Sequence, residues 1–207
     1  MKILVFGGAG FVGINIAAAL LARGYVVTLF DQAPLPVAAR KVFARAGDRL
    51  TSVQGDVTEP RTVETMVASG FDAIILGAAI TSGPARDAAD PQSILQVNLL
   101  AQLPILMAAR RSRVARIINL SSAAAYGAAA FRNSLLDEET ACDPVSLYAI
   151  TKYASEKVAA RLAALWQCDF ISVRLSAAFG PWERASGSRD TPSVPGTGFT
   201  RPMSRMP

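Results

Sequence analysis

The fold of this 207-residue chain is decided by the stretch Lys2-Ile3-Leu4-Val5-Phe6-Gly7-Gly8-Ala9-Gly10-Phe11-Val12-Gly13. Its first five residues form an apolar run that predicts a short β-strand. The glycines at positions 7, 10 and 13 each remove a side chain that would obstruct a tight turn, the approach of a pyrophosphate, or close helix packing. An Ala- and Leu-rich segment, residues 11–23, predicts a helix that stops at Gly24. With the apolar segment 25–30 that follows, this stretch predicts a βαβ unit.

Further apolar segments predict strands at residues 50–53, 72–76, 116–120 and 170–175, separated by stretches of helical composition. This alternation predicts an α/β fold with a doubly wound parallel sheet, the Rossmann arrangement, whose functional loops gather at the carboxyl ends of the strands. Longer helices are expected at residues 91–111, with a kink at Pro104, and at residues 146–166. We expect residues 1–182 to form one domain and the Gly- and Pro-interrupted residues 183–207 to be a poorly ordered tail.

The composition excludes several kinds of site. The chain has no histidine, which excludes a Ser-His-Asp triad, a Cys-His nucleophile and a histidine-ligated metal, and we expect no metal site. Cys142 and Cys168 do not form a CxxC pattern, which favours free thiols and a cytoplasmic location. The net charge of +5 comes from scattered basic residues and a basic tail, so we expect no nucleic-acid partner.

The apolar N-terminal run up to residue 22 raises the alternatives of a secretion signal or a membrane span. Its glycines and the β-branched segment 25–30 that continues it favour instead the first strand and helix of a cytoplasmic domain. We therefore expect no membrane partner.

A carboxylate at the end of the second predicted strand indicates which dinucleotide binds. Asp31 lies where a carboxylate accepts hydrogen bonds from the adenosine ribose hydroxyls, and it would repel a 2′-phosphate. No arginine follows it directly, so NAD is favoured over NADP. On its own, Asp31 could equally initiate a turn. The P-loop of nucleoside triphosphatases is excluded because no Lys-Ser/Thr pair follows Gly13.

Tyr148 and Lys152 lie four residues apart in a predicted helix, so their side chains project from one face. An ammonium group beside a phenol stabilises the phenolate, which makes Tyr148 a candidate general base or acid. Ser122 follows the fifth predicted strand, where its hydroxyl can hydrogen-bond a substrate oxygen, although Ser121 is equally eligible on chemistry alone. The Tyr-xxx-Lys spacing also occurs by chance in many helices, and serines often begin loops.

In their order along the chain, these motifs resemble the NAD-dependent epimerase/dehydratase family of extended short-chain dehydrogenases/reductases. The resemblance runs to about residue 182 and also involves Asp56-Val57, Ala78-Ala79, Asn98, Tyr126-Gly127 and Phe179-Gly180-Pro181. It implies that catalysis uses Ser122 rather than Ser121, together with Tyr148 and Lys152. It implies cofactor contacts from Gly7, Gly10, Phe11, Val12, Gly13, Asp31, Asp56, Val57, Ala78, Ala79, Asn98, Tyr148 and Lys152.

The resemblance implies hydride transfer at a secondary alcohol of a sugar or sugar derivative, assisted by Tyr148, as in an epimerase or a dehydrogenase. Dehydratases of the family place Asp-Glu directly after the catalytic Ser/Thr, whereas this chain has Ala123 and Ala124, which disfavours dehydration. Ala177 stands where epimerases often place an Asn on the substrate diphosphate, which weakens the prediction of a nucleotide-sugar substrate.

Relatives in this family continue into a substrate-binding lobe that the chain is expected to lack. The alternative function is therefore an NAD-binding module without turnover. Relatives also pair the helices equivalent to residues 91–111 and 146–166, which implies a homodimer through these helices.

Overall fold

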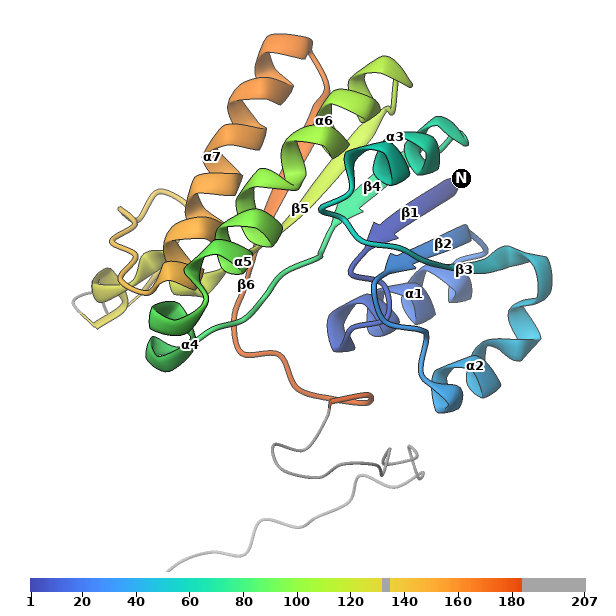
Figure 1. Cartoon of the computed structure of the whole chain (residues 1–207), viewed down its shortest axis with the longest axis horizontal. Helices are drawn as coiled ribbons and strands as arrows, with labels where there is room; N and C mark the ends of the chain where they lie inside the picture. Colours follow the sequence, from blue (N-terminus) through green and yellow to red (C-terminus); the bar gives the residue numbers. More distant parts are fainter. Residues whose placement is uncertain (132–134, 184–207) are drawn as a thin grey trace, which may run out of the picture.

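Six parallel strands form the central layer of the protein, in the order β3-β2-β1-β4-β5-β6 (Figure 1). The computed structural model describes residues 1–131 and 135–183. This strand order is that of dinucleotide-binding sheets, and it confirms the predicted doubly wound Rossmann fold. The strands are β1 (Lys2–Phe6), β2 (Val26–Asp31), β3 (Leu50–Gln54), β4 (Ala73–Leu76), β5 (Arg116–Ser122) and β6 (Asp169–Leu175).

Helices cover both faces of the sheet (Figure 1). The helices α1 (Phe11–Ala22) and α2 (Val37–Phe43) lie on one face. The helices α3 (Pro60–Ala68), α6 (Gln102–Arg111) and α7 (Leu147–Trp166) lie on the other. The shorter elements are α4 (Pro84–Ala89), α5 (Pro91–Leu95), the 3-10 helices η1 (Ala44–Arg49), η3 (Ala123–Tyr126) and η4 (Ala128–Phe131), and the π-helix η2 (Gln96–Leu100).

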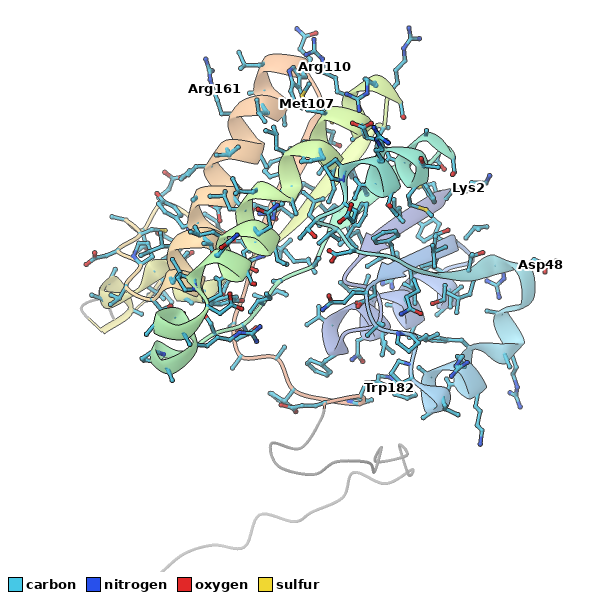
Figure 2. All side chains as sticks on the ribbon, in the orientation of Figure 1. Lys2, Asp48, Met107, Arg110, Arg161 and Trp182 are labelled. Atoms are coloured by element: carbon cyan, nitrogen blue, oxygen red, sulfur yellow. The ribbon has the colours of Figure 1, made fainter. Side chains whose placement is uncertain are left out.

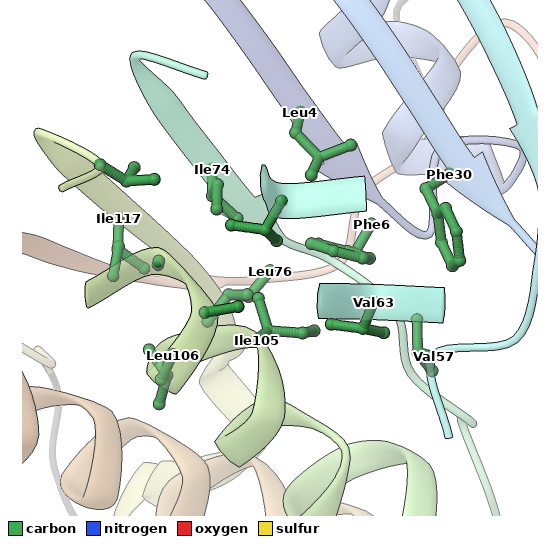
Figure 3. Close-up of a cluster of buried hydrophobic side chains, with 14 of the residues drawn as sticks. Leu4, Phe6, Phe30, Val57, Val63, Ile74, Leu76, Ile105, Leu106 and Ile117 are labelled. Atoms are coloured by element: carbon green, nitrogen blue, oxygen red, sulfur yellow. The ribbon is translucent and has the colours of Figure 1, made fainter. Parts of the chain in front are cut away.

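Each face of the sheet has its own hydrophobic core, because successive side chains of a strand point to opposite faces. On β1, Leu4 and Phe6 pack beneath α3 and α6, while Ile3 and Val5 pack beneath α1. Figure 3 shows the first of these cores, in which side chains of the strands meet Val63, Ile105 and Leu106. A strand buried on both faces reads as a continuous apolar run, which is why residues 2–6 predict it.

The kink expected at Pro104 lies earlier in the helix than predicted. The stretch Pro91–Arg111 divides into α5, the wider π-helical turn η2 and then α6, which begins two residues before Pro104. Proline has no backbone N–H, and its ring crowds the carbonyl four residues before it. The widened turn places Pro104 in the first turn of α6, where the missing donor leaves no broken hydrogen bond.

Two other sequence predictions concern the ends of the chain and its cysteines. Residues 184–207, which make up nearly all of the predicted tail, lie outside the described residues. Cys142 and Cys168 are both free thiols, as predicted, and the cytoplasmic location inferred from them stays a prediction. Just before residue 184, the side chain of Trp182 packs against the core on the α1 face (Figure 2).

Within the described residues, the stretch Pro91–Arg111 has the length and apolar composition of a membrane span, a test that core helices also pass. Here its buried side chains include Asn98, Gln102 and Ile105, and α6 packs against α3 and α7. These contacts make the stretch part of the core of the domain.

Candidate active site

The glycine loop between β1 and α1 is shaped by contacts that only glycine permits. Gly7 has a φ of +76°, and a Cβ there would lie 2.7 Å from the backbone of Gly77 and Ala78. A Cβ on Gly13 would lie 2.3 Å from the carbonyl oxygen of Gly7. The loop therefore lies directly against the end of β4 and against its own helix. These close approaches form a cradle that a side chain would fill.

Gly10 is the N-cap residue of α1, and as a glycine it has no side chain with which to cap the helix. The free N–H groups of its first turn, with the positive end of the helix dipole, form a natural site for phosphate oxygens. Gly10 also lines the neighbouring cleft, and a Cβ there would be no closer than 3.4 Å to the protein. The glycine loop thus fits the pyrophosphate of a dinucleotide.

The Asp31 carboxylate lies beneath this loop, at the end of β2. One oxygen accepts a hydrogen bond from the backbone N–H of Ala9 at 3.0 Å, and the other accepts one from Ala33 at 2.9 Å. Asp31 therefore holds a turn, and it also lines the cleft, while its predicted contact with the ribose stays a prediction. Each carboxylate oxygen can accept more than one hydrogen bond, so ribose hydroxyls can still bind there.

A cleft of about 700 Å³ opens at the carboxyl ends of the strands. Its volume falls in the range of cofactor pockets, and it lies at the switch point where the strand order reverses between β1 and β4. The predicted cofactor residues that line it are Gly7, Gly10, Asp31, Asp56, Val57, Ala78 and Ala79. Together with the glycine cradle, this set fits a dinucleotide.

The opposite wall of the cleft comes from the segment after β4, in which the sequence reasoning assigned only Ala78, Ala79 and Asn98. This wall carries Gly77, Ile80, Arg86, Asp90, Gln92, Ser93, Gln96 and Val97, and the near wall adds Gln32 and Thr58. A signal was available, because loops that follow the two strands at a switch point face each other across the ligand.

The other predicted site residues do not line this cleft. They are Phe11, Val12, Gly13, Asn98, Ser122, Tyr148 and Lys152. Gly13 acts through close packing behind the loop, and Asn98 is completely buried. The catalytic candidates lie further along the same edge of the sheet.

Ser122 is the last residue of β5, not a residue beyond it as the sequence suggested. Its hydroxyl accepts a hydrogen bond from the backbone N–H of Ala124 at 3.1 Å and so caps η3. Ser122 is half-buried, whereas Ser121 is buried. Adjacent strand residues face opposite sides of a sheet, so only one of the two serines can serve a given site.

Tyr148 and Lys152 lie in the first two turns of α7, which packs against β5 and η3. Ser146 caps this helix by accepting a hydrogen bond from the N–H of Ala149 at 3.1 Å. The Asp87 carboxylate, which also accepts a hydrogen bond from the Ser82 hydroxyl, accepts one from the N–H of Leu147 at 3.1 Å. The helix start is thereby tied to the wall of the cleft.

Lys152 is 2% exposed, and burial lowers the pKa of its ammonium group to about 8. Within residues 1–131 and 135–183, no carboxylate forms a salt bridge with it. A buried lysine with a lowered pKa is typical of functional sites, although structural causes also occur. At neutral pH the group is still mostly protonated, which leaves a positive charge one helical turn from Tyr148.

Asn98 joins the cleft wall to α7. Its amide oxygen accepts a hydrogen bond from the N–H of Ile80 at 2.7 Å. Its amide nitrogen donates to the Ile80 carbonyl at 3.0 Å and to the Thr151 hydroxyl at 3.1 Å. Both amide hydrogens are therefore used within the protein, and the predicted cofactor contact of Asn98 stays a prediction.

A family model described as the NAD dependent epimerase/dehydratase family matches residues 3–195 of the chain. A dTDP-glucose 4,6-dehydratase of Mycolicibacterium smegmatis is 36% identical over 159 residues, which cover 75% of this chain and 47% of that protein. A D-erythronate dehydrogenase of Cupriavidus necator is 32% identical over 165 residues, which cover 75% of this chain and 48% of that protein. The chain thus spans about half the length of these curated relatives.

Among solved structures, the UDP-glucose 4-epimerase of Thermus thermophilus in complex with NAD has a TM-score of 0.75 and 26% identity. The match covers 89% of this chain and 58% of that one. A UDP-N-acetylglucosamine 4-epimerase from Methanobrevibacter ruminantium has a TM-score of 0.77 and 26% identity, covering 90% and 58% of the two chains.

Proposed function

The chain belongs to the NAD-dependent epimerase/dehydratase family, whose cofactor is NAD, and we propose that it oxidises a secondary alcohol of a sugar or sugar derivative. The observation that carries this proposal is the buried Lys152 ammonium, one turn from Tyr148 in a helix tied to the wall of the cofactor cleft. In this arrangement Tyr148 is the base to which the substrate hydroxyl loses its proton.

The residues of the chain divide the work as follows. Tyr148, one helical turn before the Lys152 ammonium, acts as the base that removes the proton from the substrate hydroxyl. Ser122 holds the same substrate oxygen through its hydroxyl. When bound, NAD would accept the hydride from the substrate carbon and become NADH. The glycine loop, Asp31 and the far wall hold the cofactor in place.

Dehydration is disfavoured by the residues that follow Ser122. A departing hydroxyl needs an acid beside it, and η3 offers Ala123, Ala124 and Ala125 at this point. We therefore do not propose dehydration for this chain, although one of its relatives is a dTDP-glucose 4,6-dehydratase. We favour hydride transfer, either with net formation of NADH or with return of the hydride as in an epimerase.

The substrate class follows from the relatives, which act on nucleotide sugars and on a sugar acid according to their names. The test begins with a titration of NAD against the chain. It continues with assays of NADH formation and of epimer formation across sugars, uronates and nucleotide sugars. NAD binding without turnover on the whole panel would contradict the proposed reaction and support the binding-module alternative.

We further propose a homodimer through α5, η2, α6 and α7, where apolar side chains are exposed on neighbouring helices. They are Leu95, Leu100, Leu103, Met107, Ile150, Val158 and Leu165, and Figure 2 labels Met107 on α6. Exposed apolar patches of this kind mark association surfaces. Sedimentation should show a dimer that Leu103→Glu dissociates and that Val42→Glu, an exposed change on α2, leaves intact.

A further inference from the structure

An arginine at the end of β6 connects the elements around the catalytic candidates. The Arg174 guanidinium forms two hydrogen bonds to the Glu156 carboxylate, at 2.7 and 3.1 Å. The side chains of this ion pair are only 13% and 9% exposed. Two-point pairs of this kind are both strong and specific in geometry. The pair holds β6 against α7.

The same guanidinium lies over the ring of Tyr126, with its carbon 4.8 Å from the ring centroid. Tyr126 ends η3, the helix that Ser122 caps, and its hydroxyl donates to the Asp137 carbonyl at 2.8 Å. Cation–π contact is strengthened where water is excluded. Arg174 therefore also fixes the turn that follows Ser122.

Glu156 lies one helical turn beyond Lys152, and both side chains are on the buried face of α7. Groups four residues apart on a helix can form an ion pair. Yet Glu156 pairs with Arg174, and Lys152 forms no salt bridge within the described residues. Burial acts to raise the pKa of Glu156, but the hydrogen bonds and positive charge of Arg174 act against it, and the pKa lies below its ordinary value.

We propose that Arg174 is a positioning residue of the active site, which engages Glu156 so that its carboxylate does not pair with Lys152, and which fixes Tyr126 after Ser122. The role of Arg174 in an active site rests on the proposed function, whereas its effect on Glu156 and Lys152 can be measured in the protein without NAD or substrate. Without Arg174, the Glu156 carboxylate would be a buried charge, and Lys152 lies four residues before it on the same buried face of the helix.

The charged and titratable groups around this pair come from several elements. Lys157 on α7 also lowers the pKa of Glu156, and Cys142 makes a smaller contribution to raising the pKa of Arg174. Tyr126 on η3 faces Arg174, and Tyr148 precedes Lys152 by one turn. Arg174 is the charged group that contacts Glu156 directly, so its removal is expected to have the largest effect.

The test follows the titration of Lys152 by NMR of the lysine side chains. The lysines of the chain are Lys2, Lys41, Lys152 and Lys157, so the Lys152 signal can be assigned by its loss in a Lys152→Met variant. We expect Arg174→Met to raise the pKa of Lys152 from about 8 by about one pH unit or more. The double variant Arg174→Met/Glu156→Gln should return it close to the original value.

Arg116→Met is the matched control, because Arg116 forms an exposed pair with Asp169 between β5 and β6. It should leave the Lys152 titration unchanged. If Arg174→Met also leaves it unchanged, Glu156 does not turn to Lys152 and the inference is wrong. A rise that persists in the double variant would overturn it as well.

A second measurement, turnover compared with NAD affinity, separates the contact with Tyr126 from the charge effect. In the double variant we expect a normal Lys152 titration and normal NAD binding. The Arg174 guanidinium no longer covers the Tyr126 ring, so turnover should stay reduced. Arg174→Lys, which keeps the charge without the planar contact, should behave like the double variant. Because the lysine titration needs neither NAD nor substrate, it stays readable even if the proposed reaction is wrong.

Discussion

The Asn98 side chain donates a hydrogen bond to the Thr151 hydroxyl, 3.1 Å away, and thereby joins the wall of the cofactor cleft to the helix that carries Lys152. Asn98 lies in the π-helical turn η2, and π-helical turns occur often at functional sites. The widened turn and α7, the helix of the catalytic candidates, are thus parts of one connected structure.

Replacing Asn98 with Leu should both destabilise the protein and weaken NAD binding. The change leaves the Ile80 backbone groups and the Thr151 hydroxyl without this partner, which is expected to cost about 3 kcal/mol. NAD affinity should fall by about tenfold, because Ile80 lines the cleft. Thr151→Val removes one of the three Asn98 bonds and the bond from the Thr151 hydroxyl to the Tyr148 carbonyl, and should cost about 2 kcal/mol. Urea unfolding measures the loss of stability, and NAD titration measures the loss of affinity. Equal effects of Asn98→Leu and Thr151→Val would contradict the role given to Asn98.

Alanine substitutions in the glycine loop should separate folding from cofactor binding. Gly13→Ala places a Cβ 2.3 Å from the Gly7 carbonyl oxygen, so the loop must shift and both stability and NAD binding should decrease. Gly10→Ala meets no close atom but adds a methyl group to the lining of the cleft. This variant should unfold like the wild type and bind NAD at least about tenfold more weakly. Normal NAD binding by Gly10→Ala would show that the pyrophosphate lies elsewhere.

The two neighbouring serines provide a test of the catalytic assignment. Ser122→Ala removes the hydroxyl expected to hold the substrate oxygen and should reduce kcat by about 100-fold, with a stability loss of about 1 kcal/mol from the missing cap. Ser121→Ala changes a buried residue on the other side of the strand and should leave kcat within about threefold. Tyr148→Phe should abolish turnover while NAD binding stays intact. Steady-state kinetics on a substrate found by the panel assay would decide, and a reversed order of the serine variants would transfer the role to Ser121.

The buried Lys152 should make stability rise with pH in the absence of NAD. Its pKa is about 8 in the folded protein and 10.5 in an unperturbed lysine. Between these values the folded state loses the proton that the unfolded state keeps, so the unfolded state binds more protons and stability increases with pH. The full rise is about 3 kcal/mol, and below pH 8 the stability lacks this contribution.

Lys152→Met should flatten this part of the pH profile, since no titrating group remains at that position. Lys157→Met, an exposed change on the same helix, should leave the rise in place. Chemical denaturation at a series of pH values compares the three proteins. A wild-type profile parallel to that of Lys152→Met would mean that the lysine is not buried in solution.

The fold was predictable because its central strands are apolar runs separated by helices. The end of β5 was not, since Ser121 and Ser122 are polar and become part of the strand only by pairing with Arg174 and Leu175 of β6. The sequence predicted a helix irregularity at Pro104, but the irregularity is the π-helical turn at Gln96–Leu100, just before it.

The cofactor side of the site was predictable for a different reason. Glycines and Asp31 follow their strands directly, so local sequence places them at the carboxyl edge. The far wall of the cleft and the partners of Asn98, Glu156 and Arg174 depend on contacts between distant segments. No spacing rule connects Asn98 to Thr151 or Tyr126 to Arg174, and only the assembled layers bring them together.

The strand order also determines when the cofactor site can form as the chain is synthesised. β1 is made first but lies in the middle of the sheet, between β2 and β4. The cradle around Gly7 is completed by Gly77 and Ala78, which directly follow β4. A nascent chain that ends before these residues has the glycines and Asp31 but only one wall of the binding site. NAD can therefore stabilise the growing domain only after β4 and the start of the next loop have left the ribosome.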